Sequence, residues 1–518
     1  MSERARFRDL FEARETLSPA ELAFERRRRT AGLVVGPLLF LLLLLFPVAG
    51  PDPRAARLAA ILAWVLTWWI TEAVPIPITA LLGPALAVLC GVGGAKEMFA
   101  SFGDPVIFLF LGSFVIAEVM SVHGLDRRIA YGILDRRWVG SSSTRILLAF
   151  VVITAGLSMW LSNTATTAMM YPIAMGVLAA LSRLLACGDG TPANLQKMRF
   201  GTALLLVCAY ASSIGGIGTP VGTPPNLIAL GQLAELTGTR IPFFQWMALA
   251  VPIVAAMLVF AVLYFRFAFP PEVGTIEGSA AFIAEERGRL GALKAGERNV
   301  LAAFLVTAAL WVLPGVAAIV LGAGSPASRT LSSLLPEGVV ALLGAASLFV
   351  LPVNWKERRF TASWNDVSRI DWGTLLLFGG GLALGGAMFR TGLASTVGHA
   401  LTGLTGARSL VALTFLFSVF AIYFTEVTSN TATATMLVPL AIAAARAAGV
   451  SPLEPAIGCA IGCSMAFMLP VATPPNAIVY GSGCVPITKM VRAGFWFNLA
   501  AAIIVPTGVL VMCHLLGL

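Results

Sequence analysis

The chain has 518 residues, of which 58% are hydrophobic and only 12% are charged, and its mean hydropathy is +0.87. A soluble domain has about a quarter of its residues charged, so this composition excludes a soluble globular protein. The net charge of +9 does not indicate nucleic-acid binding, because eight arginines fall in the first 30 residues, directly before the first apolar block.

The apolar residues are gathered in long blocks. A helix needs about 20 apolar residues to cross the hydrocarbon core of a bilayer. Eleven blocks approach that length, which predicts an all-α polytopic membrane protein with about eleven transmembrane helices. The blocks are 32–49, 57–71, 76–94, 145–161, 199–217, 244–269, 298–322, 337–352, 408–424, 454–470 and 493–517.

Residues 1–30 form an Arg-rich tail, and residues 31–56 contain the first predicted span. Excess Arg and Lys mark the cytoplasmic side of membrane proteins, so we expect the N-terminus in the cytoplasm and the chain in the cell's inner membrane. The first apolar block lies behind 30 polar residues and lacks a small-residue cleavage site. It is therefore expected to be a retained span rather than a signal peptide.

Residues 57–269 form the first of two predicted repeats. They contain FLFLGSFVIAEVMSVHGL at 108–125, LSNTATTAMMYPIA at 161–174 and GTPPN at 222–226. Ser and Asn favour helix ends and caps, so we expect a discontinuous helix that ends near Ser162 and resumes at Asn163 or Thr164. Gly222 and two prolines, which cannot continue a helix, predict an unwound bend at membrane depth.

A charged linker at 270–297 leads to the second predicted repeat, 298–518. The same three motifs follow in the same order, as LLFGGGLALGGAMFRTGL at 376–393, TSNTATATMLVPLA at 428–441 and ATPPN at 472–476. The first two are displaced by 267 or 268 residues and the third by 250, which indicates an internal duplication. Duplicated halves, often of inverted topology, are typical of secondary transporters that bind substrate near mid-membrane.

The repeated polar strings suit ions of both signs. A helix that begins at a Ser-Asn-Thr string presents free N–H groups and the positive end of its dipole, which favour an anion. Helix ends and unwound bends expose carbonyl and hydroxyl oxygens, which hard cations prefer. The sequence therefore predicts a sodium-coupled carrier of a small anion, with two oxygen-rich cation sites beside one anion site.

Three acidic residues, Glu72, Glu118 and Glu426, lie in or beside apolar blocks, where an acid indicates function. Glu426 either orients the second Ser-Asn-Thr string, binds or polarises its cation, faces an aqueous cavity or pairs with an arginine. Arg390 either attracts substrate or extends to the membrane interface.

Other function classes lack their residues. The seven cysteines have no disulfide or metal spacing and are interpreted as packing residues. No nucleotide-binding GxxxxGK[ST] string is present, which disfavours a pump. No nucleophile has a His or acid partner at helical spacing, so an enzyme is not expected.

These motifs, together with TEAVPIPITALL at 71–82, resemble those of the divalent anion:sodium symporter family over nearly all of residues 57–518. The resemblance implies a homodimer of eleven-span protomers embedded in membrane lipid, with inverted repeats and an elevator mechanism. It also implies two re-entrant hairpins, placed here at about 99–121 and 372–390. Na+ would be the co-transported ion, and no organic cofactor is expected.

The resemblance also implies the site residues. One Na+ would be held by Ser158, Ser162, Asn163 and the carbonyl of Gly222. The second would be held by Thr425, Thr428, Asn430 and Ala472. The substrate carboxylates would meet residues of the strings and bends, namely Ser162, Asn163, Thr164, Thr223, Pro224, Ser429, Asn430, Thr431, Thr473 and Pro474.

C4-dicarboxylates such as succinate, malate or fumarate are the expected substrates. Citrate and inorganic dianions remain open alternatives, as does sodium-independent exchange by the same fold. Ser158 and Thr425, each one helical turn before a Ser-Asn-Thr string, favour a cation-coupled carrier over an exchanger. An anion channel would need a continuous pore, which a closed central cluster of motifs does not provide.

Overall fold

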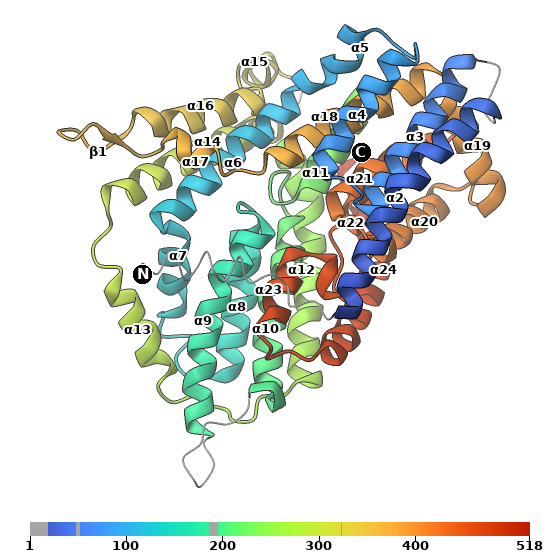
Figure 1. Cartoon of the computed structure of the whole chain (residues 1–518). Helices are drawn as coiled ribbons and strands as arrows, with labels where there is room; N and C mark the ends of the chain where they lie inside the picture. The colour runs from blue at the N-terminus through green and yellow to red at the C-terminus, as the bar shows by residue number, and fades with distance from the viewer. Residues whose placement is uncertain (1–18, 48–51, 186–194, 323) are drawn as a thin grey trace.

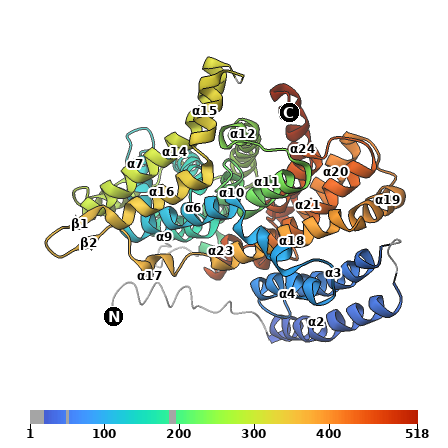
Figure 2. The same cartoon turned by 90° about the horizontal axis from the view of Figure 1, so that it is seen from above.

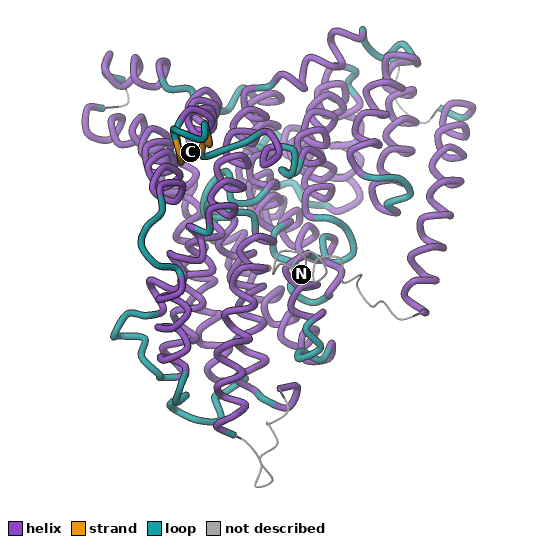
Figure 3. The backbone as a smooth tube through the Cα atoms, turned by 60° about the vertical axis from the view of Figure 1, so that its left-hand side comes forward, coloured by secondary structure: helices purple, strands orange, loops and turns teal. Residues whose placement is uncertain are grey.

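The computed structural model describes residues 19–47, 52–185, 195–322 and 324–518, and helices dominate them (Figures 1 and 3). The helices as far as the predicted linker are α2 (Pro19–Leu45), α3 (Pro53–Thr71), α4 (Ile76–Leu89), α5 (Ala95–Ala100), α6 (Pro105–His123), α7 (Leu125–Leu134), α8 (Ser143–Ser158), α9 (Asn163–Leu184), α10 (Arg199–Gly216), α11 (Pro224–Thr237), α12 (Phe243–Ala268) and α13 (Ser279–Arg289). The remaining helices are α14 (Ala295–Leu321), α15 (Pro326–Leu334), α16 (Glu337–Val350), α17 (Trp364–Val367), α18 (Trp372–Arg390), α19 (Leu393–Thr405), α20 (Leu410–Phe424), α21 (Asn430–Ala447), α22 (Leu453–Cys463), α23 (Pro474–Gly481) and α24 (Ile487–Leu516).

The predicted fold class, an all-α polytopic membrane protein, is confirmed. Seven helices in the described ranges are long and apolar enough to cross a membrane, or up to nine if each of two bent helix pairs is one span. Three shorter apolar helices, α4, α8 and α22, add to them. In the same ranges the strands are β1 (Pro352–Asn354) and β2 (Arg359–Phe360), which form an antiparallel pair after α16. Short 3-10 segments are η1 (Ser101–Gly103), η2 (Leu195–Lys197) and η3 (Pro470–Ala472).

The N-terminal helix begins earlier than the sequence predicted. Residues 1–18 of the predicted tail lie outside the described residues, but the rest of the tail is the first part of α2. No room exists for a Cβ on Gly32 or Gly36 of α2, which lie against Thr71 and Trp64 of α3. The indole of Trp68 donates to Gly32 O at 2.9 Å. The two helices pack closely and, with α4, form a group along one edge of the molecule (Figure 2).

The Ser-Asn-Thr strings lie at the tips of helix hairpins, not inside broken helices. Ala155 of α8 and Asn163 of α9 both lie against Gly215 and Gly216, at the end of α10. Leu178, further along α9, lies beside Gly201 near the start of α10, so α9 runs antiparallel to α10. Helix α8 packs along α10 and ends at Ser158 beside the end of α10, so it runs parallel to α10, and the chain reverses direction before it resumes as α9.

The second string repeats this arrangement in α20 and α21. Thr414 of α20 lies against Gly458 of α22, and Ala421 lies against Gly462 one turn later, so α20 and α22 are parallel. Helix α21 is joined to α22 by a short turn and packs along it, so it runs the other way. Small residues on α10 and α22 allow both hairpins to pack against them.

The hairpins expected at 99–121 and 372–390 are corrected by the structure. Residues 105–123 and 372–390 each form one continuous helix, α6 and α18. The glycines of α18 make close contacts rather than a turn, since Gly380 lies against the backbone of Ala80 and Gly381 lies against Thr435. A glycine-rich apolar stretch can form a turn or allow close helix packing, and in α18 the absence of side chains lets α4 and α21 approach.

The two bends lie head to tail. Helix α10, before the first bend, packs on α23, after the second. Helix α11, after the first bend, packs on α22, before the second. The hairpins follow the same rule, since α9 contacts α23 and α21 contacts α11. This reciprocal packing agrees with two repeats of inverted topology, and it brings both hairpin tips and both bends to one place in the molecule.

Candidate functional site

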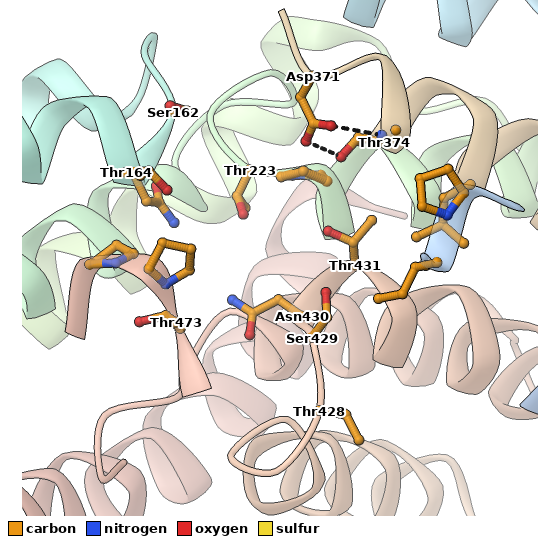
Figure 4. A pocket seen from close by; sticks show the side chains of 18 of the residues that line it. Ser162, Thr164, Thr223, Asp371, Thr374, Thr428, Ser429, Asn430, Thr431 and Thr473 are labelled. Atoms are coloured by element: carbon orange, nitrogen blue, oxygen red, sulfur yellow. Dashed lines mark hydrogen bonds between the residues drawn. The ribbon is translucent and has the colours of Figure 1, made fainter. Parts of the chain in front are cut away.

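A cavity of about 1120 Å³ lies where the two hairpin tips and the two bends meet. Figure 4 shows side chains from both halves around it. All ten residues predicted to contact substrate line the cavity: Ser162, Asn163, Thr164, Thr223, Pro224, Ser429, Asn430, Thr431, Thr473 and Pro474. The predicted cation residues Gly222, Thr428 and Ala472 line it as well. Ser158 and Thr425 do not, because they are fully buried behind the hairpin tips.

The first hairpin tip is organised by its own side chains. Ser162 is the N-cap of α9, and its hydroxyl oxygen accepts from the backbone N–H of Ala165 at 3.2 Å. The hydroxyl of Ser158, the last residue of α8, donates to Oδ1 of Asn163, the first residue of α9, at 2.8 Å. The two predicted cation ligands therefore already touch across the tip.

The second tip has the same contact with a threonine in place of the serine. The Thr425 hydroxyl lies 2.7 Å from Oδ1 of Asn430 and 3.0 Å from the carbonyl oxygen of Cys463 on α22. Thr428 lies closer to the cavity, and its hydroxyl is 2.5 Å from that of Thr433.

The predicted interruption of the chain at both proline pairs is confirmed. Thr223 and Thr473 have nearly the same extended backbone, with φ −148° and ψ 141° for the first and φ −144° and ψ 147° for the second. Pro224 and Pro474 then start α11 and α23, where a missing N–H has no cost. Both new helices begin at the cavity.

Four helices, α9, α11, α21 and α23, thus begin at this one cavity. The first N–H groups of a helix have no partner within the helix, and its dipole is positive at that end. Together with the hydroxyl groups of the strings and bends, these ends provide donors and a positive potential for an anion. The arrangement needs no arginine or lysine at the cavity floor.

Backbone oxygens converge beside the first bend. Gly222 packs so closely that a Cβ on it would lie 2.9 Å from the carbonyl oxygens of both Ser158 and Met159, and closer still to that of Gly216. A set of neutral oxygens suits a monovalent hard cation. Among the described residues, no group of three or more His, Cys, Asp or Glu side chains could hold a metal ion, so acidic ligand clusters do not compete for this role.

The hydrogen bonds of Glu426 decide among the roles that the sequence left open for it. Its carboxylate accepts from the backbone N–H groups of Phe467, Met468 and Leu469 at 2.7–3.1 Å. It also accepts from the side-chain amide of Asn498 on α24 at 2.7 Å. The side chain therefore ties the second hairpin tip to the second bend and to α24.

The cavity also has charged residues that motif reasoning missed or left without a role. Asp371 accepts from the N–H of Thr374 at 3.0 Å and caps α18, and both residues line the cavity (Figure 4). Glu118 lines it from α6. At its edge are Arg26, Arg28, Arg29, Glu72 and Arg369, and Arg28 and Arg29 lie 3.4 and 3.7 Å from the carboxylate of Glu72. The run of arginines before the first span is the signal in the sequence for this edge.

Two solved structures share the fold. They are the YdaH transporter of Alcanivorax borkumensis, with a TM-score of 0.54 over 82% of this chain and 88% of that chain, and MtrF of Neisseria gonorrhoeae, with a TM-score of 0.52 over 82% and 83%. Both are 14% identical to this chain, so the likeness concerns the fold alone.

Sequence comparison is more specific. The chain is 38% identical over 477 residues to the sodium-dependent dicarboxylate transporter SdcS of Staphylococcus saprophyticus, covering 92% of this chain and 89% of that protein. It is 37% identical to SdcS of Staphylococcus aureus over the same shares. Residues 28–517 match the family model described as the sodium:sulfate symporter transmembrane region. The predicted resemblance and the expectation of a membrane carrier rather than an enzyme are confirmed, and the chain belongs to the sodium:sulfate symporter family.

Proposed function

We propose that the protein is a secondary transporter that carries small divalent anions together with Na+, with C4-dicarboxylates such as succinate, malate or fumarate as substrates. The observation that carries this proposal is the single cavity on which four helix N-termini and two oxygen-lined hairpin tips converge. The name of the relative SdcS, a sodium-dependent dicarboxylate transporter, supports the same substrate class and the same ion.

A dicarboxylate has two negative groups, and the cavity has two related sets of donors. We expect one carboxylate at Ser162, Asn163 and Thr164 and the other at Ser429, Asn430 and Thr431. Thr223 and Thr473 face the same space from the bends and would set the length and hydroxylation of the anion accepted, together with Pro224 and Pro474.

Each tip would hold one Na+. The first site comprises Ser158, Ser162, Asn163 and Gly222, and the second Thr425, Thr428, Asn430 and Ala472. Moving one charge through a potential of 100 mV costs about 2.3 kcal/mol. Two cations therefore cancel the penalty for a dianion that enters against an inside-negative potential.

We expect access to the cavity from the side of the N-terminal segment, because Arg26, Arg28 and Arg29 are among the residues that line it. By the positive-inside rule this side is the cytoplasm, so the conformation faces inward across the inner membrane. Alternating access would then move the hairpins and bends relative to the rest of the chain as an elevator, within a homodimer.

The test is uptake of radiolabelled succinate by purified protein in proteoliposomes, with and without an inward Na+ gradient. We expect uptake only with the gradient. Uptake that ignores Na+ but requires an internal anion would identify an exchanger. Sodium-dependent uptake of citrate or sulfate, without succinate, would correct the substrate and retain the mechanism.

A further inference from the structure

The asparagine that ends each TPPN string makes the same contacts in both halves. Nδ2 of Asn226 donates to the carbonyl oxygens of Gly216 and Thr219, at 3.1 and 2.7 Å. Nδ2 of Asn476 donates to those of Ala466 and Leu469, at 3.2 and 3.0 Å. In each half the acceptors lie ten and seven residues before the asparagine, so each side chain holds its bend in one shape.

The oxygen of each side-chain amide has no partner among the described residues. Both asparagines are fully buried, and Oδ1 of each has no hydrogen-bond donor within the part of the chain that the structure describes. A buried acceptor left unpaired is costly. Other buried side-chain atoms are also unpaired, but these two are an equivalent pair at the same position of two repeats.

The contacts of Nδ2 place the side chain of Asn226 beside the first candidate cation site. Its Nδ2 bonds the carbonyl oxygen of Gly216, the oxygen against which Gly222 packs most closely. The carbonyl oxygens of Ser158 and Met159 approach Gly222 from the hairpin tip, and Oδ1 of Asn163 lies against Gly216. Most polar atoms around this point are oxygens that accept, and a hard cation is the species that satisfies several of them at once.

We propose that Oδ1 of Asn226 and Oδ1 of Asn476 bind the two co-transported cations, while Nδ2 of each keeps the bend carbonyls in position. Neither residue was among the predicted ligands. The inference rests on the proposed sodium coupling and adds one ligand to each site. It also gives the final residue of the TPPN string a function that the prolines and threonine do not supply.

The experiment measures the rise in melting temperature of the full-length purified protein as Na+ replaces choline at constant ionic strength. The variants are Asn226→Leu and Asn476→Leu, which remove donor and acceptor, and Asn226→Asp and Asn476→Asp, which keep an acceptor oxygen and add a negative charge. We expect the Na+ concentration that gives half of the rise in melting temperature to be at least about tenfold higher in each Leu variant than in the wild type. Each Asp variant should need less Na+ than the matching Leu variant, because it keeps an acceptor oxygen and its charge attracts the cation, although it lacks the Nδ2 donor to the bend carbonyls.

Gln232→Leu is the matched control, because Gln232 is also fully buried on α11 and its amide atoms have no partner among the described residues, but it lies against Gly385 of α18. Its sodium dependence should equal that of the wild type. Leu variants with wild-type sodium dependence would overturn the assignment. So would monodisperse Asp variants that respond to Na+ as poorly as the Leu variants, since an acceptor oxygen at these positions would then contribute nothing to cation binding.

Two further outcomes are separable. If one variant is not monodisperse, the same substitution at the other asparagine decides. A wild-type protein whose melting temperature does not respond to Na+ overturns the proposed coupling, and the asparagine assignment with it.

Discussion

The hydroxyl of Ser158 donates to Oδ1 of Asn163 across the tip of the first hairpin, at 2.8 Å. The contact between Thr425 and Asn430 repeats it at 2.7 Å in the second half. In each pair the first residue is buried behind the tip and the second lines the cavity. The hydroxyl of Ser158 or Thr425 thus fixes the orientation of an asparagine side-chain amide at the start of a helix.

Asn163→Ala and Asn430→Ala should each abolish sodium-dependent succinate uptake while the protein stays folded. Each substitution removes an amide that faces the cavity and leaves the helix intact, because alanine is a good helix former. Uptake in proteoliposomes, with melting temperature as the folding check, measures this. Asn365→Ala, at an exposed position of α17, is the control and should transport normally. Normal uptake by either cavity variant would remove that tip from the site.

Gly222→Ala should raise the Na+ concentration needed for half-maximal uptake or abolish uptake. A Cβ there would lie 2.9 Å from two carbonyl oxygens of the first tip, so these oxygens would have to move. The control is Gly156→Ala on α8, where no neighbouring atom of the described residues lies within 4 Å of an added Cβ and the helix should gain about 0.5–1 kcal/mol. Equal sodium dependence in the two variants would contradict the convergence of oxygens at Gly222. The second bend carries Ala472 at the corresponding position, so its site already accommodates a Cβ.

Glu426→Ala should lower the free energy of unfolding by about 3 kcal/mol or more. The substitution leaves three backbone N–H groups of the bend and the amide of Asn498 without their acceptor. Thermal unfolding in detergent measures the loss. Glu285→Ala on α13 removes only an exposed ion pair with Arg289 and should cost less than about 0.5 kcal/mol. If Glu426→Ala melts like the wild type but loses sodium dependence, the carboxylate is a cation ligand instead.

Arg390→Gln should transport succinate like the wild type. The sequence left Arg390 as a substrate attractor or an interfacial residue, but its side chain pairs with Glu97 at 2.7 Å, and both side chains are more than 40% exposed. An exposed pair of this kind contributes about 1 kcal/mol at most. A raised KM for succinate that disappears at high ionic strength would show that Arg390 attracts the substrate.

The residues of the cavity could be predicted from the sequence because they lie in polar motifs within apolar blocks and because these motifs recur in both halves. Polar strings such as Ser162–Thr164 interrupt apolar blocks, and the motifs recur in the same order in the second half, displaced by 250 to 268 residues. The polar groups of such residues need hydrogen-bond partners from protein, ligand or water when they lie inside the membrane. Motifs of this kind are therefore expected to lie together. The structure brings the ten predicted substrate residues to one cavity.

The path of the chain around the cavity was harder to predict. Ser162 would cap the following helix in a broken helix and in a hairpin alike, so local propensity cannot distinguish the two. Packing of α8 and α9 on α10 decides for the hairpin, and those contacts join residues 23 to 60 positions apart. The glycines of α18 led to the wrong prediction of a hairpin at 372–390 for the same reason, because their close contacts with α4 and α21 are tertiary.

The contacts of the residues that stabilise the shape of the site could not be predicted from local sequence patterns either. Glu426 acts on backbone groups 41 to 43 residues away, and Asn226 on carbonyls seven and ten residues away. Nothing in the spacing of polar residues indicates which main-chain groups an unwound bend leaves unpaired. Those partners become visible only when the bend is traced in three dimensions.

The most direct test of the central claim is the initial rate of succinate uptake as a function of external Na+ at a fixed, subsaturating succinate concentration. Two cation sites that complete one anion site predict a rate that is near zero without Na+ and rises sigmoidally. A rate that is independent of Na+, or that rises hyperbolically as for one ion, would contradict the paired sites.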